Sequence, residues 1–159
     1  MRLKDQLDGR RVLITGVTGF VGEALLQRLL TDVPGAQPVA LVRPKAGQPG
    51  RERIAALLRK PTLAAAAEAA GGIDALVAKV GVVEGHLGSL PDLPTDLDVV
   101  VHCAGDVSFD PPIQDAFRTN VVGTHSLVTK VLEASQKAER LIHYVHVSTA
   151  YVGGRRRGA

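Results

Sequence analysis

The sequence predicts a doubly wound α/β domain with five parallel strands in the order 3-2-1-4-5, and two observations support this prediction. Short apolar runs alternate along the chain with helix-length amphipathic segments, which is the pattern of repeated β-α-β units. The runs are apolar throughout, which is typical of strands that helices cover on both faces. The 159 residues fit a single domain spanning residues 1–159, because domains commonly contain about 100–200 residues.

Five apolar segments are the predicted strands, and their order in the chain sets the predicted topology. They are residues 12–14, 39–42, 80–83, 99–101 and 144–147. Right-handed crossovers between parallel strands place the first strand at the centre of the sheet. The second and third strands then lie on one side of it, and the fourth and fifth strands lie on the other.

The segments between these strands have helical patterns. Residues 20–30 place Val21, Ala24, Leu25 and Leu29 on one predicted apolar face. Residues 51–70 predict a helix that is interrupted at Pro61 and ended by two glycines.

A long helix is predicted to begin after two consecutive prolines, because proline is favoured in the first turn of a helix. Apolar and small polar residues recur along it at steps of three and four, and they form a wide stripe. The residues of this stripe are Ile113, Ala116, Phe117, Asn120, Val121, Thr124, Leu127, Val128 and Val131.

Composition and charge exclude several classes of function. Aromatic residues make up 3% of the chain, the net charge is +3 and there is no tryptophan, so we expect no nucleic-acid partner. We expect no membrane span, because no segment approaches the about 18 apolar residues that one requires. The single cysteine, Cys103, favours a reducing cytoplasmic location and a buried apolar role. The histidines have no metal-ligand spacing, so no metal site is expected.

The segment that follows the first strand, residues 15–22, has the sequence TGVTGFVG. Its glycines would allow a tight turn, close approach of the backbone to a pyrophosphate, and close packing of the next helix. The amino terminus of that helix would attract the anion. The alternative is a glycine-rich turn that binds no ligand. The candidate dinucleotide-binding residues here are Thr15, Gly16, Thr18, Gly19, Phe20, Val21 and Gly22.

The residue after the second strand indicates which dinucleotide binds. Many NAD-binding folds place an acid there to hold the ribose hydroxyls, whereas this chain has Arg43, with Lys45 nearby. A guanidinium can pair with the 2′-phosphate of NADP. The sequence therefore predicts NADP(H) as the cofactor, and the alternative is that Arg43 is a solvated loop cation.

These segments resemble the extended short-chain dehydrogenase/reductase superfamily, whose fingerprint is TGxxGxxG. Further matches are LVRPK, VVEGHL, DVVVHCAGDVSFD, NVVGT and HVSTAYVGG, in that order along the chain. Their combination is most similar to the fatty acyl-CoA reductase and thioester reductase branch, which carries a male-sterility-type NAD-binding domain. The resemblance implies a Rossmann-like fold and the dinucleotide-binding part of an NADPH-dependent reductase. Its small-molecule substrate would be a fatty acyl-CoA or another acyl thioester, reduced to an aldehyde or alcohol.

The resemblance also implies roles for residues outside the first turn. His86 and Leu87 stand where relatives carry an Asp-Leu pair that contacts adenine. Ala104 and Gly105 correspond to the segment that lines the ribose on the nicotinamide side. Asn120 is the family's helix asparagine, and its place on the apolar stripe implies a buried amide that needs partners. A structural link between the fourth and fifth strands and a catalytic relay both remain open for it.

Two hydroxyl residues follow the fifth strand. The resemblance implies that Thr149, with Ser148 beside it, polarises the carbonyl of the substrate. The alternative is a turn that ends the strand. Neither Tyr144 nor Tyr151 has a lysine four residues later, so the family's proton-donating Tyr-x-x-x-Lys pair is absent. We therefore expect a C-terminally incomplete reductase that binds dinucleotide without turnover, truncated before the substrate-binding half.

Other interpretations stay open. The chain could belong to an NAD(P)-dependent dehydrogenase or epimerase that acts on a steroid or a nucleotide sugar, although Arg43 argues against the NAD-using epimerases. It could also be a non-catalytic dinucleotide-binding module. Arg155, Arg156 and Arg157 are either a solvated loop or a contact for the phosphates of coenzyme A. Exposed apolar sheet and helix surface leads us to expect self-association into a homo-oligomer.

Overall fold

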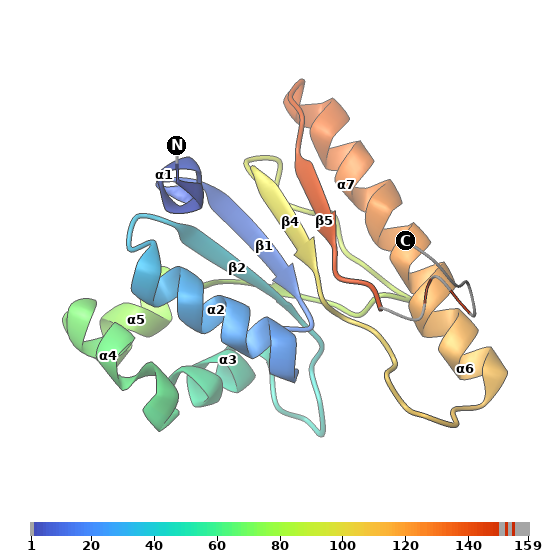
Figure 1. Cartoon of the computed structure of the whole chain (residues 1–159), viewed down its shortest axis with the longest axis horizontal. Helices are drawn as coiled ribbons and strands as arrows, with labels where there is room; N and C mark the ends of the chain where they lie inside the picture. The colour runs from blue at the N-terminus through green and yellow to red at the C-terminus, as the bar shows by residue number, and fades with distance from the viewer. Residues whose placement is uncertain (1, 150–151, 153, 155–159) are drawn as a thin grey trace.

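A computed structural model describes residues 2–149, 152 and 154, and its sheet has the predicted topology (Figure 1). Five strands lie in the order β3-β2-β1-β4-β5, and every neighbouring pair is parallel. Because the strands are parallel, their carboxyl ends meet at one edge of the sheet. The strands are β1 (Arg11–Thr15), β2 (Gln37–Val42), β3 (Gly81–Glu84), β4 (Val99–His102) and β5 (His143–His146).

Helices lie on both faces of this sheet, with α2 to α5 on one side and α6 and α7 on the other (Figure 1). The helix predicted over residues 51–70 is present as three shorter pieces. The short, exposed α1 and the α5 helix have no counterpart in the predicted pattern. The elements are α1 (Leu3–Leu7), α2 (Phe20–Asp32), α3 (Gly50–Leu58), η1 (Pro61–Leu63), α4 (Ala64–Ala69), α5 (Ile73–Lys79), α6 (Ile113–Phe117), η2 (Arg118–Gly123) and α7 (Thr124–Ala138).

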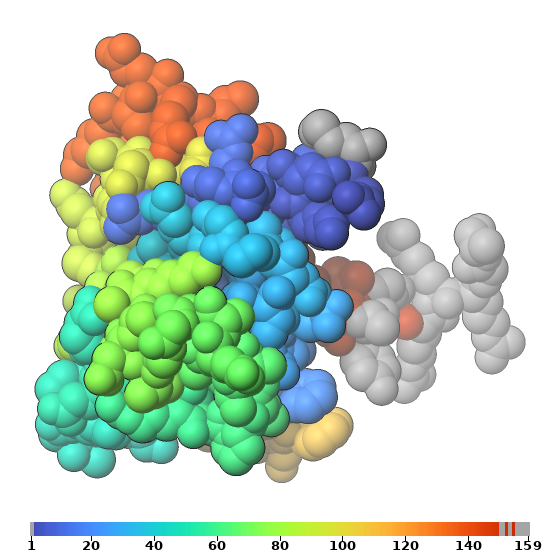
Figure 2. All heavy atoms as spheres, turned by 90° about the vertical axis from the view of Figure 1, so that its left-hand side faces the viewer, coloured from blue at the N-terminus to red at the C-terminus, as the bar shows by residue number. Residues whose placement is uncertain are grey.

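Successive residues of β1 face opposite sides of the sheet, so the strand contributes to two apolar cores. Val12 and Ile14 pack with the buried side chains of α2 to α5. Leu13 packs on the other face with Leu127 and Val131 of α7. Figure 2 shows the first helical layer from outside, with the green side chains of α4 and α5 beside the blue ones of α2.

The apolar face of α2 differs from the predicted one. The helix buries Gly22, Leu26, Leu29 and Leu30, whereas Val21 and Ala24 of the predicted face are exposed. The cause is the close approach of the backbone at Gly22, which turns this side of the helix towards the sheet.

The long predicted helix is continuous as α6, η2 and α7, and η2 is a π-helical turn. Its predicted apolar stripe is correct only in the second half, where Leu127 and Val131 are buried. Ile113, Phe117 and Val121 are exposed by 78%, 56% and 51%. The difference arises because α6 extends beyond the sheet, while α7 lies along it (Figure 1).

The expectation that helices cover both faces of every strand is wrong for β5. This strand is at the edge of the sheet, and three of its four residues are exposed. An edge strand has a neighbouring strand on one side only. Tyr144 packs against the core that includes Leu127, whereas Val145 is exposed. Within the described residues, no helix combines the length and apolar character needed to cross a membrane.

Candidate functional site

Two glycines of the turn between β1 and α2 are required by the protein's own packing. Gly16 has a φ of +68°, and a Cβ there would lie 2.7 Å from the backbone nitrogen of Ala104. A Cβ at Gly22 would lie 2.3 Å from the carbonyl oxygen of Gly16. Any larger side chain at either position would displace backbone, so these glycines close the turn against the loop after β4.

Gly19 differs from these two glycines, because fewer contacts within the protein would restrict a side chain at this position. It immediately precedes α2, and a Cβ there would have a single close neighbour, the Gly16 oxygen at 3.3 Å. Thr18 and Val21 are exposed, and Phe20 is exposed by 92%. The first N–H groups of α2 lack partners within the helix, and no side chain caps this end. The open face of the turn is therefore a backbone surface suited to an anion.

Thr15 is the last residue of β1, directly before the turn, and its side chain is fully buried. Its Oγ1 accepts hydrogen bonds from the backbone nitrogens of Cys103 at 3.2 Å and Ala104 at 3.1 Å. It also lies 2.6 Å from Nδ1 of His102, the residue paired with Thr15 in the register of β1 and β4. Burial raises the pKa of the Cys103 thiol, which disfavours a reactive thiolate.

His102 is a site residue that the sequence prediction missed. Its side chain is fully buried at the end of β4, between Thr15 and the Oγ1 of Thr124, which lies 3.1 Å from its Nε2. A polar residue that ends an otherwise apolar strand is the only sequence signal for it. The role of His102 becomes clear only from the strand register, which places Thr15 beside it.

The loop after β4 is held by Asn120 of η2. The Asp106 N–H donates to Oδ1 of Asn120 at 2.7 Å, and the Asn120 amide donates back to the Asp106 carbonyl at 2.9 Å. A Cβ at Gly105 would lie 3.2 Å from the same Oδ1. The expected burial of Asn120 is wrong, because the residue is exposed. Its partners lie in the loop that carries Ala104 and Gly105, so it does not link β4 to β5.

Arg43 follows β2, the strand that pairs directly with β1. Its side chain is exposed, and among the described residues its guanidinium has no hydrogen-bond or ion-pair partner. Its carbonyl oxygen accepts a hydrogen bond from Nη1 of Arg53 at 2.5 Å. Lys45 lies in the turn that follows, where it pairs with Gln48. This end of β2 therefore carries two cationic residues, and the nearby carboxylate of Glu84, the register partner of Val42, is hydrogen-bonded to the Gly50 N–H.

The segment after β3 is built mainly by internal contacts. Oε1 of Glu84 accepts the Gly50 N–H at 2.8 Å, which holds the start of α3 against the sheet edge. His86 is exposed, and its Nδ1 accepts the Gly88 N–H at 3.1 Å. Leu87 is half-buried and packs so closely against η2 that a Cβ at Gly123 would lie 2.7 Å from it.

Ser148 and Thr149 follow β5 at the carboxyl edge of the sheet and are exposed. The Thr149 carbonyl accepts a hydrogen bond from the Val152 N–H at 3.2 Å. Tyr151 and Arg155 to Arg157, which also entered the sequence analysis, lie outside the described residues. Within the described part of the chain, no three His, Cys, Asp or Glu side chains gather in a group that could hold a metal ion.

Comparison with known proteins places this arrangement in a family. Residues 14–159 match an NAD-binding family described as male sterility protein. Fatty acyl-CoA reductase 1 of Xenopus laevis is 35% identical over 160 residues, which cover 94% of this chain and 30% of that protein. The chain thus spans less than a third of the length of this relative.

Solved structures share the fold. A thiolation-reductase di-domain from an archaeal non-ribosomal peptide synthetase superposes with a TM-score of 0.70 at 24% identity, covering 93% of this chain and 37% of that one. The terminal R domain of the myxalamid PKS-NRPS pathway superposes with a TM-score of 0.66 at 28% identity, covering 90% and 35%. The resemblance inferred from the sequence is confirmed. The chain belongs to the male sterility family of nicotinamide-dinucleotide-binding domains, within the extended short-chain dehydrogenase/reductase superfamily.

Proposed function

We propose that this chain is the NADP(H)-binding part of a reductase that transfers hydride to a fatty acyl-CoA or another acyl thioester. The observation that carries the proposal is the asymmetry among the three turn glycines. Gly16 and Gly22 are explained by several close contacts within the protein, whereas a Cβ at Gly19, beside the amino terminus of α2, would have one close neighbour, the Gly16 oxygen at 3.3 Å. A ligand whose phosphates approach the backbone there explains the third glycine.

The pyrophosphate would bind to the first N–H groups of α2, next to Thr18, Gly19 and Phe20. These N–H groups and the positive end of the helix dipole stabilise an anion without requiring a charged side chain. The turn itself would be held against Cys103 and Ala104 by Thr15, Gly16 and Gly22, which would not contact the pyrophosphate through their side chains. Val21 faces solvent on the first helical turn, where it would lie beside the ligand.

The 2′-phosphate of NADP would bind to Arg43. An acid at this position would repel that phosphate, whereas the exposed guanidinium of Arg43 can donate paired hydrogen bonds to it. Arg53 holds the carbonyl of Arg43 and so positions the residue. His86 and Leu87 would border the adenine, where an imidazole nitrogen can accept a hydrogen bond in place of the usual carboxylate.

The substrate would be reduced at the opposite end of the same sheet edge. When bound, the dinucleotide supplies the hydride. Ser148 and Thr149 would donate hydrogen bonds to the oxygen of the thioester carbonyl as negative charge develops on it. Asn120 would keep Ala104 and Gly105 in place for the nicotinamide ribose. A Tyr-x-x-x-Lys pair does not occur among these 159 residues.

A calorimetric titration of the chain with NADPH and with NADH tests the cofactor assignment. Arg43→Glu is expected to weaken NADPH binding by about 10–100-fold, because charge-assisted hydrogen bonds contribute about 1.5–3 kcal/mol. NADH binding should change little. Arg59→Glu is the matched control, since Arg59 is an exposed arginine at the far end of α3. A preference for NADH that survives Arg43→Glu would contradict the phosphate assignment.

Two further properties belong to the same proposal. The single cysteine supports a cytoplasmic location, because reducing compartments do not select for disulfides. The exposed apolar residues of α6 and η2 support self-association into a homo-oligomer or contact with the acyl part of the substrate.

A further inference from the structure

We propose that His102 is a positioning residue for the turn after β1, held as the neutral tautomer with its proton on Nε2 by Thr15 and Thr124. The effect on dinucleotide affinity rests on the proposed function, whereas the tautomer does not. The argument begins with Thr15, whose Oγ1 contacts three groups at once.

A threonine hydroxyl can donate one hydrogen bond and accept two. The N–H groups of Cys103 and Ala104 are both donors, and they use the two acceptor positions of the Thr15 oxygen. The hydroxyl hydrogen must then point towards Nδ1 of His102, only 2.6 Å away. Nδ1 is therefore an acceptor, and the proton of the neutral ring lies on Nε2, which donates to Thr124.

The surroundings of His102 also favour its neutral form. The side chain is fully buried, and the ring of His146 on β5 lies 5.1 Å away between centroids. Burial, and secondarily the charge of His146, lower the pKa of His102 from 6.5 to about 4. Tyr144 lies 6.3 Å away between centroids, and burial raises the pKa of its hydroxyl, so it stays neutral. Cys103, the next residue in the chain, likewise remains a thiol.

A second proton on His102 would break this arrangement. It would place an N–H on Nδ1, facing a Thr15 oxygen that already accepts two hydrogen bonds. One of the bonds to Cys103 or Ala104 would be lost, and the loop after β4 would move. Gly16 packs directly against Ala104, so the turn would lose its support. His102 thus links the protonation of a buried ring to the geometry of the turn.

The tautomer is measured directly by ¹⁵N NMR of the histidine ring in the full 159-residue chain, without any dinucleotide. We expect an unprotonated Nδ1 and a protonated Nε2 for His102 at neutral pH. We also expect slow hydrogen exchange at the Cys103 and Ala104 amides, which Thr15→Val accelerates. A protonated Nδ1 would overturn the proposal, whatever the chain binds.

Two substitutions of His102 by amide residues then test whether the ring positions Thr15 through a hydrogen bond or only fills space. The side-chain oxygen of His102→Asn reaches the place of Nδ1 and can accept from Thr15, whereas His102→Gln reaches the place of Nε2. We expect His102→Asn to keep NADPH affinity within about threefold and His102→Gln to weaken it about tenfold, because a buried donor loses its acceptor. Thr124→Val, which removes only the Nε2 partner, should resemble His102→Asn.

Equal losses for the two amide variants would show that His102 only fills space. If the wild-type chain does not bind NADPH at all, the proposed function fails. The ring tautomer and the amide exchange rates then still decide the assignment of His102.

Discussion

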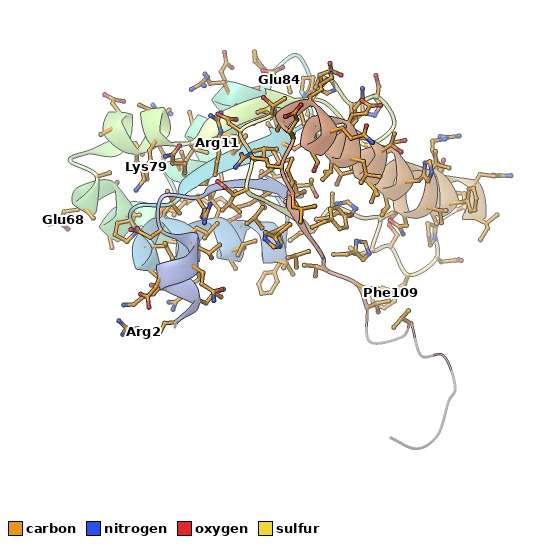
Figure 3. All side chains as sticks on the ribbon, turned by 90° about the horizontal axis from the view of Figure 1, so that it is seen from above. Arg2, Arg11, Glu68, Lys79, Glu84 and Phe109 are labelled. Atoms are coloured by element: carbon orange, nitrogen blue, oxygen red, sulfur yellow. The ribbon has the colours of Figure 1, made fainter. Side chains whose placement is uncertain are left out.

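The two sides of the sheet, on either side of β1, differ in how well helices bury their apolar side chains. Towards β2 and β3, the helices α2 to α5 cover the sheet, and Leu26, Ile54 and Leu76 are buried. Towards β5, the helix α6 leaves Ile113 and Phe117 exposed, and Phe109 stands at the margin of the molecule (Figure 3). The side expected to bind the adenosine phosphates therefore has a well-packed core beneath its helices, whereas the side expected to meet substrate presents apolar surface.

The largest expected effect tests this difference in burial. Leu26→Ala should lower the free energy of unfolding by about 3 kcal/mol, because it leaves a cavity in the core beneath α2. Phe117→Ala, in the exposed helix α6, should lower it by less than about 1 kcal/mol despite removing more atoms. Urea unfolding of both variants measures the two values. Similar losses would mean that α6 is as well packed as α2.

The next effect is a pH dependence of the free energy of unfolding, which arises from His102 on β4, between the two sides. His102 has a pKa lowered from 6.5 to about 4, so the unfolded chain binds a proton more readily than the folded one. Its neutral form supports the fold fully above pH 6.5, and that contribution is lost as the pH falls from 6.5 to about 4. The loss amounts to roughly 3 kcal/mol.

Unfolding free energies of the wild type and His102→Asn at a series of pH values test this sign. The asparagine variant lacks the titrating ring, so its stability should fall less over the same interval. Parallel curves for the two proteins would contradict the assigned shift.

The smallest effect on stability is expected at the exposed apolar face. The double variant Ile113→Gln, Phe117→Gln should change the free energy of unfolding by less than about 0.5 kcal/mol, since both side chains are exposed. It should nevertheless reduce the self-association that we propose for the wild type, which would increase with concentration. Sedimentation velocity compares the two. A wild type that remains monomeric at all concentrations would refute the proposed homo-oligomer.

Most of the fold could be predicted from the sequence because the strands are continuous apolar runs and their crossovers have one hand. The predicted order 3-2-1-4-5 is confirmed. The faces of the helices were harder to predict, because helical periodicity does not reveal where a glycine allows close approach. Gly22 turns α2 so that Leu26 is buried and Val21 is exposed.

The tight packing at Gly16 and Gly22 could be predicted, because a turn that brings backbone against backbone requires glycine. The role of Arg43 in binding a phosphate stays a prediction. His102 was missed because its partners, Thr15 and Thr124, come from distant positions that only the strand register and the packing of α7 bring together. The burial of Asn120 was wrong for a related reason. Its stripe continues beyond the sheet, so an apolar pattern there does not imply an apolar environment.

The measurement that tests the central claim most directly is NADPH binding to Gly19→Ala, by calorimetry alongside thermal unfolding. The added methyl group has a single close neighbour, the Gly16 oxygen, so the free energy of unfolding should change by no more than about 1 kcal/mol. The methyl group would occupy the space reserved for the pyrophosphate, so affinity should fall about tenfold or more. An unchanged affinity in a stable variant would contradict the assignment of this turn.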